Sequence, residues 1–188
     1  MKIIFLDIDG VLNGYNKWTD FIINISKKLH IPVNFMRETL DIFGIKEKYV
    51  KRLSKIVHCT GAKVVMSSSW RNGYWKVPYE EQAEDQKKLT DLLNKYHIEV
   101  IDITPSCKSG RREEEIKKWL NETKFDIESF VILDDESFDL QGFVGKELVK
   151  TSAVIEGQMI CGAAYEDTGL KRKHVKQAIQ ILRKQEPI

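Results

Sequence analysis

Short, uninterrupted runs of apolar residues recur along the chain, and most of them end at polar residues. The first run covers residues 3–6 and stops at Asp7. A run without alternation is typical of a strand that is buried on both faces, as in a parallel sheet. The expected strands cover residues 3–6, 64–66, 100–103, 131–133 and 148–149.

Between these runs, apolar residues take the spacing of one helix face. Val50, Leu53 and Val57, for example, recur three or four positions apart ahead of the second strand. The same spacing predicts helices around residues 89–96, 116–120 and 175–182. Strands that alternate with helices indicate an α/β fold with a parallel sheet.

Residues 14–45 do not fit a minimal connection between two strands. They carry two apolar stripes of their own, separated by a break at Pro32. We therefore expect a core domain formed by residues 1–13 and 46–188, with a small helical insertion at residues 14–45.

Length and composition suit one soluble globular domain. The chain has 188 residues, of which 42% are apolar and 31% charged. A net charge of +2 excludes a strongly basic nucleic-acid coat but leaves room for a local basic site. Three separated cysteines favour a reducing compartment, and no apolar run approaches the roughly 20 residues of a membrane span. We expect a cytoplasmic protein that does not insert into a membrane.

The first strand is followed by two carboxylates, Asp7 and Asp9, and by Gly10, which permits a sharp turn. This pattern suits phosphoryl transfer through an aspartyl phosphate, with Asp7 as nucleophile and Asp9 as acid and base. A strand end formed by turn residues is the alternative. A calcium-binding EF-hand loop is excluded, because Val11 and Leu12 occupy positions that need an oxygen ligand and a glycine.

Two further segments offer groups for a phosphate. Serines at positions 67–69 follow the second strand, where a hydroxyl and backbone N–H groups bind phosphate oxygens; a helix N-cap is the alternative. Lys108, Arg111 and Arg112 precede a helix, and one of them would offset phosphate charge; a solvated basic turn is the alternative.

A pair of adjacent carboxylates, Asp134 and Asp135, ends the fourth strand, and Asp139 follows. Adjacent carboxylates repel one another unless a cation lies between them. Mg²⁺ prefers such oxygen ligands together with water and substrate phosphate, so Asp135 and Asp7 form a plausible Mg²⁺ pair. An exposed acidic loop is the alternative.

In chain order, these four segments resemble the haloacid dehalogenase (HAD) superfamily of Mg²⁺-dependent phosphohydrolases. The chain is most similar to the small HAD domain of the Swiss Army Knife RNA-repair proteins. The segments that carry this resemblance are residues 3–13, 61–71, 102–105, 111–120, 130–139 and 169–182.

The resemblance implies roles for individual residues. Asp7 would be the nucleophile and Asp9 the acid and base. Mg²⁺ would be held by a carboxylate oxygen of Asp7, the carbonyl of Asp9, and Asp135, with help from Asp134 or Asp139.

The resemblance also implies a hydroxyl and a cation in the site. Ser68 would supply the hydroxyl, with Ser69 as the near alternative. The family pattern has a glycine after its arginine, whereas Glu113 follows Arg112 here, so the cation is either Arg112 or Lys108.

The implied architecture is three-layered and Rossmann-like, with strand order 3-2-1-4-5. The insertion at residues 14–45 stands where the superfamily carries its C1-type cap. A cap this small would leave the site open to a nucleotide or to the end of a polymer.

We therefore expect an HAD-type phosphatase that acts on a nucleotide or a nucleic-acid 3′-phosphate. A phosphatase for small metabolites or sugar phosphates and a non-catalytic phosphate-binding module are the alternatives. Two features point toward nucleic acid. Aromatic residues near the site could stack on bases, for which packing in the core is the alternative. A basic C-terminal cluster could contact a phosphate backbone, for which a solvated helix face is the alternative. These residues are Tyr15, Trp18, Trp70, Tyr74 and Trp75, and Lys171, Arg172, Lys173, Lys176, Arg183 and Lys184.

Overall fold

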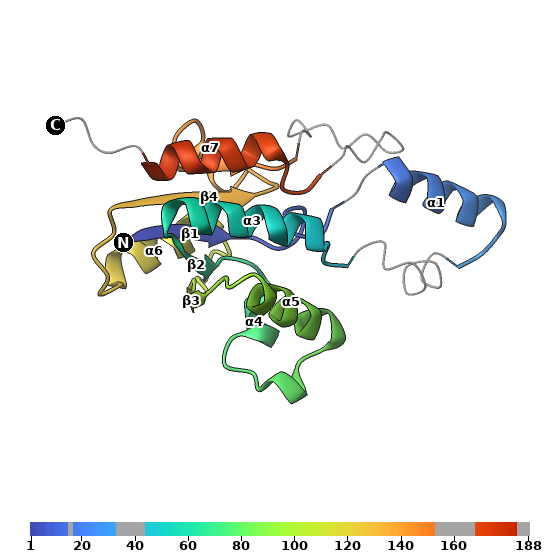
Figure 1. The fold of residues 1–188 in the computed structure, drawn as a ribbon, viewed down its shortest axis with the longest axis horizontal. Helices are drawn as coiled ribbons and strands as arrows, with labels where there is room; N and C mark the ends of the chain where they lie inside the picture. The colour runs from blue at the N-terminus through green and yellow to red at the C-terminus, as the bar shows by residue number, and fades with distance from the viewer. Residues whose placement is uncertain (15–16, 33–43, 153–167, 184–188) are drawn as a thin grey trace.

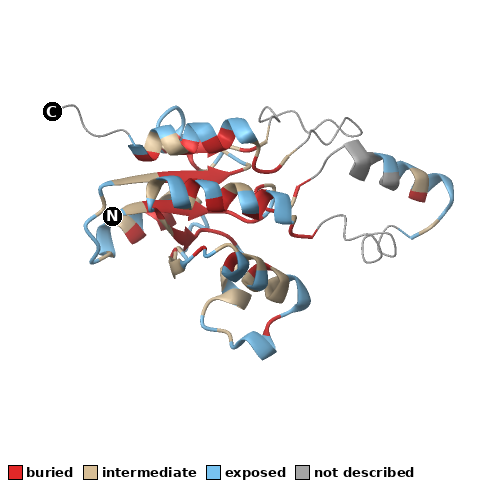
Figure 2. Cartoon of the chain, in the orientation of Figure 1, coloured by how far each residue is buried: buried red, intermediate tan, exposed pale blue. Residues whose placement is uncertain are grey.

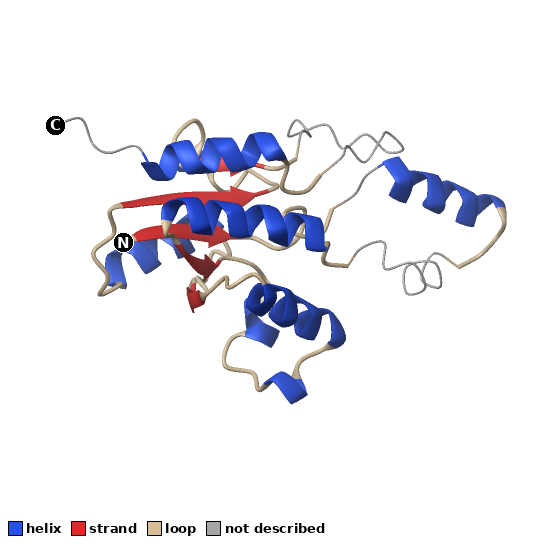
Figure 3. Ribbon diagram, viewed as in Figure 1, coloured by secondary structure: helices blue, strands red, loops and turns tan. Residues whose placement is uncertain are grey.

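The computed structural model describes residues 1–14, 17–32, 44–152 and 168–183. The expected strands form one parallel sheet in the order β3-β2-β1-β4-β5, which confirms both the α/β class and the predicted strand order (Figure 3). The strands are β1 (Lys2–Leu6), β2 (Lys63–Met66), β3 (Val100–Ile103), β4 (Ser129–Asp134) and β5 (Leu148–Lys150).

Helices lie on both faces of this sheet, as Figure 1 shows. The described helices are α1 (Lys17–Lys28), α3 (Glu47–Thr60), α4 (Arg71–Tyr74), α5 (Glu84–Lys95), α6 (Arg112–Glu122) and α7 (Arg172–Arg183), with short 3₁₀ turns at Tyr79–Glu81 and Gln141–Phe143.

The sheet is buried on both faces, which explains why its strands do not alternate between apolar and polar residues (Figure 2). Ile4 and Leu6 pack beneath α3, α5 and α7. Ile3 and Phe5 pack beneath α6, where Phe5 meets the ring of Trp119 edge-on at a centroid distance of 5.4 Å.

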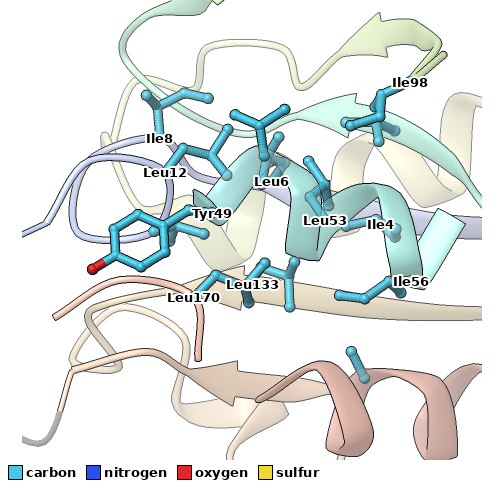
Figure 4. Packing of buried hydrophobic residues seen from close by; sticks show 14 of the residues in the cluster. Ile4, Leu6, Ile8, Leu12, Tyr49, Leu53, Ile56, Ile98, Leu133 and Leu170 are labelled. Carbon is cyan, nitrogen blue, oxygen red and sulfur yellow. The ribbon is translucent and has the colours of Figure 1, made fainter. Parts of the chain in front are cut away.

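Helix α3 supplies several large buried side chains to the core that lies between the sheet and helices α3, α5 and α7. Tyr49, Leu53 and Ile56 lie over the sheet beside Leu6 and Leu133 (Figure 4). Because α3 leads directly into β2, this packing fixes the position of the second strand against the first.

The helical insertion is described only in part. Its first predicted apolar stripe, residues 18–29, begins in α1 (Lys17–Lys28) and ends one residue beyond that helix. The second stripe falls mainly in residues 33–43, which lie outside the described residues, so the division into core and cap stays a prediction. Among the described helices, none is long and apolar enough to cross a membrane.

A strap formed by residues 168–171 holds the turn that follows β1. The N–H groups of Gly169 and Leu170 donate to the carbonyls of Gly10 and Val11, both at 2.9 Å. Gly169 has a φ of +97°, and a Cβ atom there would lie 2.4 Å from the ring of Tyr49. A glycine is therefore required where the strap crosses α3.

His174 closes the amino-terminal end of α7 behind this strap. Its Nδ1 accepts the N–H of Lys171 at 3.1 Å, and the residue is only 3% exposed. Burial, which is the largest cause, and the charges of Lys173, Lys171 and Arg52 together lower the pKa of His174 to about 4. The folded protein therefore keeps this imidazole neutral.

We expect His174 to weaken the fold as the pH falls. In the unfolded chain the pKa of His174 is 6.5, so the imidazole of the unfolded state is protonated below that pH. The imidazole of the folded state is protonated only near pH 4, so between these values protonation favours the unfolded state. The free energy of unfolding should drop by about 2 kcal/mol between pH 6.5 and 4.5 on account of this group alone.

Urea unfolding at several pH values checks this against His174→Asn, which keeps an acceptor for the Lys171 N–H but does not titrate. The variant should show a shallower loss of stability across this range. Equal pH dependence of both proteins would contradict the assignment.

Candidate active site

Three carboxylates meet at the carboxyl end of the sheet. Oxygen atoms of Asp7, Asp134 and Asp135 lie within 4.8 Å of one another. Asp7 follows β1 and Asp134 ends β4, and these strands are paired so that Leu6 stands opposite Leu133. The Asp7 N–H extends this pairing by donating to the Leu133 carbonyl at 3.0 Å. The sheet order thus brings the segment after β1, which carries Asp7, together with the segment at the end of β4, which carries Asp134 and Asp135.

The side chains of this group are acidic and mostly buried. Asp7 is 4% exposed and Asp134 is 1% exposed. Burial raises the pKa of Asp7 to about 8, with Arg112 opposing the shift and Asp134 adding to it. Burial also raises the pKa of Asp135 to about 7, as do the charges of Asp134 and Glu136. Such a cluster favours a cation that would stabilise the charged form of its carboxylates.

Arg112, the first residue of α6, is the cation that reaches this group. Its guanidinium forms an ion pair with Asp134 and lies 3.4 Å from Asp7 Oδ1. Burial works against its charge, but Asp7 and Asp134 raise the pKa of Arg112 above its usual range. The other expected cation, Lys108, is exposed in a turn and makes no ion pair with the described carboxylates.

Asp139 stands outside the group of three. Its Oδ2 accepts the Arg112 N–H at 3.0 Å, and its carbonyl accepts the Glu113 N–H at 3.2 Å. The residue thus holds the first turn of α6, where an acidic side chain also complements the helix dipole. Its contact with the site runs through the backbone that carries Arg112.

Gly10 allows the turn after β1 to approach Asp135. Its φ is +65°, and a Cβ atom there would lie 2.2 Å from Asp135 Oδ2. The Gly10 carbonyl accepts the Thr151 hydroxyl at 2.8 Å and the Gly169 N–H at 2.9 Å. The sequence pattern assigned no individual role to Thr151 or Gly169, which fix this turn although they lie far from it along the chain.

Asp9 is exposed, and two neighbours hold its carboxylate. Oδ1 accepts the side-chain amide of Asn13 at 2.7 Å, and Oδ2 accepts the indole N–H of Trp70 at 3.0 Å. Asn13 also accepts the Gly10 N–H at 2.8 Å, which ties the carboxylate to its own turn. The sequence had suggested Trp70 as an aromatic surface; the structure shows it as a hydrogen-bond donor to Asp9.

The three serines after β2 have different environments. Ser68 is buried, and a hydrogen bond from its side chain lowers the pKa of Asp7. Ser69, the near alternative, is exposed. Ser67 is 1% exposed, and its hydroxyl finds no hydrogen-bond partner among the described residues. A buried hydroxyl without a partner is rare, so Ser67 is a further candidate that the sequence did not single out.

A buried ion pair joins the loops around the site. Arg71 Nη2 lies 2.9 Å from Glu115 Oε1, and its guanidinium also donates to the hydroxyls of Thr104 and Ser106 at 3.3 and 3.2 Å. These contacts connect the segments after β2 and β3 to α6. The sequence pattern assigned no role to Glu115.

The fold and the acidic group together define an α/β protein with a candidate site at the carboxyl ends of its parallel strands. The family described as the HAD domain in Swiss Army Knife RNA repair proteins matches residues 3–155, and the chain belongs to this family. Membership implies a phosphohydrolase. A search of curated proteins found no match. Residues 169–182, which also carried the resemblance, lie beyond the matched range.

We expect Trp70→Phe to impair turnover without weakening substrate binding. The variant keeps the ring but removes the N–H that orients Asp9, so kcat for an aryl phosphate should fall by about 10- to 100-fold while KM changes little. Trp75→Phe makes the same chemical change on the same segment and serves as control. An equal effect of both substitutions would contradict an orienting role for Trp70.

We expect Arg112→Met to lower kcat by about 100-fold or more, because it removes the charge beside Asp7, whereas Lys108→Met should change kcat less than about twofold. Steady-state kinetics with an aryl phosphate would measure both, and thermal melts would establish that each variant is folded. A larger loss in Lys108→Met would assign the cation to Lys108 instead.

Proposed function

We propose that this protein is a Mg²⁺-dependent phosphatase that works through an aspartyl phosphate on Asp7. The observation that carries the proposal is the meeting of Asp7 with Asp134, Asp135 and Arg112 in one buried group. Strands separated widely in the sequence place these residues together, which a solvated acidic loop would not require.

The residues present fit a divalent metal ion with oxygen ligands. Gly10 leaves room for Asp135 to lie against the turn after β1, and the crowded carboxylates lack enough positive charge. Asp7 and Asp135, with the carbonyl of Asp9, would hold Mg²⁺. Asp134 forms an ion pair with Arg112 and accepts the Glu136 N–H at 2.9 Å, so it would contribute to the site mainly by holding Arg112 in place. When bound, Mg²⁺ would neutralise carboxylate charge and polarise a phosphoryl oxygen.

In the proposed reaction, a carboxylate oxygen of Asp7 attacks phosphorus and the bond from phosphorus to the ester oxygen breaks. Asp9 gives its proton to the departing oxygen. Water then attacks the phosphoryl group, Asp9 takes a proton from that water, and phosphate leaves with Asp7 restored. Asn13 and Trp70 hold Asp9 in place for both transfers. Arg112 offsets charge on the transferring group.

The second acid supports phosphate esters as the substrates. An alkoxide leaving group needs a proton, and Asp9 is exposed at the mouth of the site where it would supply one. Among such esters, a nucleotide or a nucleic-acid 3′-phosphate is favoured, because the family is described from RNA repair proteins. A small-metabolite or sugar-phosphate phosphatase is the second candidate.

The decisive test is Asp7→Asn with an aryl phosphate. The wild-type protein should release phosphate with Mg²⁺ and lose this activity with a chelator, and the variant should lose at least about 10³-fold in kcat because it lacks the nucleophile. Hydroxylamine should trap the acyl phosphate in the wild-type protein alone. Asp126→Asn, an exposed carboxylate just ahead of the amino end of β4, is the matched control and should keep full activity.

The same assay separates the candidate functions. Faster release from 3′-phosphorylated oligonucleotides than from nucleoside monophosphates or sugar phosphates supports a nucleic-acid end as substrate. Phosphate binding without turnover by the wild-type protein would contradict the catalytic proposal and support a phosphate-binding module. Undiminished turnover by Asp7→Asn would reject the mechanism.

A further inference from the structure

Positive charge is concentrated on two helices, although the chain as a whole carries a net charge of only +2. Helix α7 contains four Lys or Arg residues and no acidic residue. Helix α3 also contains four, with Glu47 as its one acidic residue. Glu47 is engaged elsewhere, since it accepts from Lys95 at 2.6 Å and from Tyr96 at 2.7 Å.

The two helices lie side by side and run in the same direction (Figure 1). Near their amino-terminal ends, Arg52 Nη1 of α3 donates to the Leu170 carbonyl at 2.8 Å. At their carboxyl-terminal ends, Arg183 Nη2 of α7 donates to the Cys59 carbonyl at 2.8 Å. The charges of both helices are therefore presented along one shared seam.

Helical spacing places the cations along that seam. On α3, residues three or four positions apart share a side, so Lys48 and Lys55 lie on the side where Arg52 meets α7. On α7, the same spacing aligns the other cations with Arg183. The basic seam consists of Lys48, Arg52, Lys55, Arg172, Lys176 and Arg183, of which Arg52 is half-buried and the others are exposed.

The basic seam begins at the candidate active site. The N–H of Lys46, just ahead of α3, donates to the Leu12 carbonyl at 2.9 Å. The N–H of Leu170, just ahead of α7, donates to the Val11 carbonyl at 2.9 Å. Both helices thus start at the turn that carries Asp9, and their amino-terminal dipole ends add positive potential there.

No carboxylate of the described residues forms an ion pair with any of the six cations. The positive potential also acts on a neighbour, because Lys173, Lys171 and Arg52 contribute to the lowered pKa of His174. Rows of unpaired cations on a protein of nearly balanced charge are the electrostatic pattern that a polyanion recognises.

We propose that the basic seam binds the phosphodiester backbone of a nucleic-acid strand whose terminal phosphate enters the site at Asp7. The entry of that phosphate rests on the proposed function; binding along the seam does not. Residues 172–183 of α7 span about 16 Å at 1.5 Å per residue. At the axial rise of about 3.4 Å per nucleotide in a stacked strand, that length corresponds to roughly five nucleotides, and to fewer in an extended strand, so a mononucleotide would not reach along the seam.

The test is the affinity of a fluorescent 3′-phosphorylated 12-nucleotide RNA, measured by anisotropy with Asp7→Asn protein so that the ligand is not consumed. Adding Lys55→Glu and Lys176→Glu changes one exposed cation on each helix. Affinity should fall at least about tenfold, and the slope of log affinity against log salt should become shallower by about 1.4, as expected for two lost phosphate contacts.

The matched control is Lys118→Glu with Lys124→Glu, which makes the same change in net charge. Lys118 lies on α6, on the other face of the sheet, and Lys124 lies just beyond it, and both are exposed. This pair should change affinity less than about twofold. In the wild-type background, Lys55→Glu with Lys176→Glu should hydrolyse an aryl phosphate at an unchanged rate, and thermal melts should show both proteins folded.

Three results would overturn the proposal: equal losses in the two charge-reversed pairs, no loss in Lys55→Glu with Lys176→Glu, or binding of poly-glutamate as tight as that of the RNA. A DNA strand of the same length should lose affinity by the same factor, because the contacts are to the backbone; a loss confined to one base sequence would contradict this. If the wild-type protein hydrolyses no phosphate ester but the affinity difference remains, the proposed reaction fails while the basic seam stands.

Discussion

Asp7, Asp134 and Asp135 bring more negative charge into a buried space than the guanidinium of Arg112 offsets. Burial and their mutual repulsion raise the pKa values of Asp7 and Asp135. The surrounding backbone holds these side chains together in three places. The Asp7 N–H continues the β1–β4 ladder, Asp139 fixes the first turn of α6, and the strap with Thr151 holds the turn at Gly10. A preorganised excess of negative charge of this kind is what a bound cation would relieve.

The same arrangement gives the carboxylates different surroundings. Asp134 is fully buried and bonded to Arg112 and to a backbone N–H, so it positions the cation. Asp9 is exposed and held by neutral donors from Asn13 and Trp70, which orient it without a formal charge. The roles proposed for Asp7 and Asp9 make different demands, because a nucleophile needs to be held close to a cation, whereas an acid and base needs access to both the leaving group and water.

Much of this could be predicted from the sequence because it depends on local pattern and on one topological rule. Unbroken apolar runs located the strands, and a sheet whose order reverses beside β1 places the residues after β1 and β4 at one crevice. The contacts that orient the side chains of the site could not be predicted in this way. The bonds of Trp70 to Asp9 and of Glu115 to Arg71, and the choice between Arg112 and Lys108, depend on where loops meet after folding. Periodicity carries no information on such contacts, and residues 33–43 and 153–167 lie outside the described residues.

Net charge proved a poor guide to what the surface presents. A balance of +2 argued against a nucleic-acid coat, yet α3 and α7 carry cations along one seam that form no ion pair with a carboxylate of the described residues, while acidic residues gather at the end of the sheet. The separation follows from the topology. Both helices begin at the turn after β1, so their cations and dipole ends lie on the side from which the proposed anionic strand would approach. In the proposed scheme, contacts along the seam would hold a longer anion and help to bring its end into the acidic site. A small phosphate ester would lack those contacts and would depend on the charge that Mg²⁺ supplies at the carboxylates.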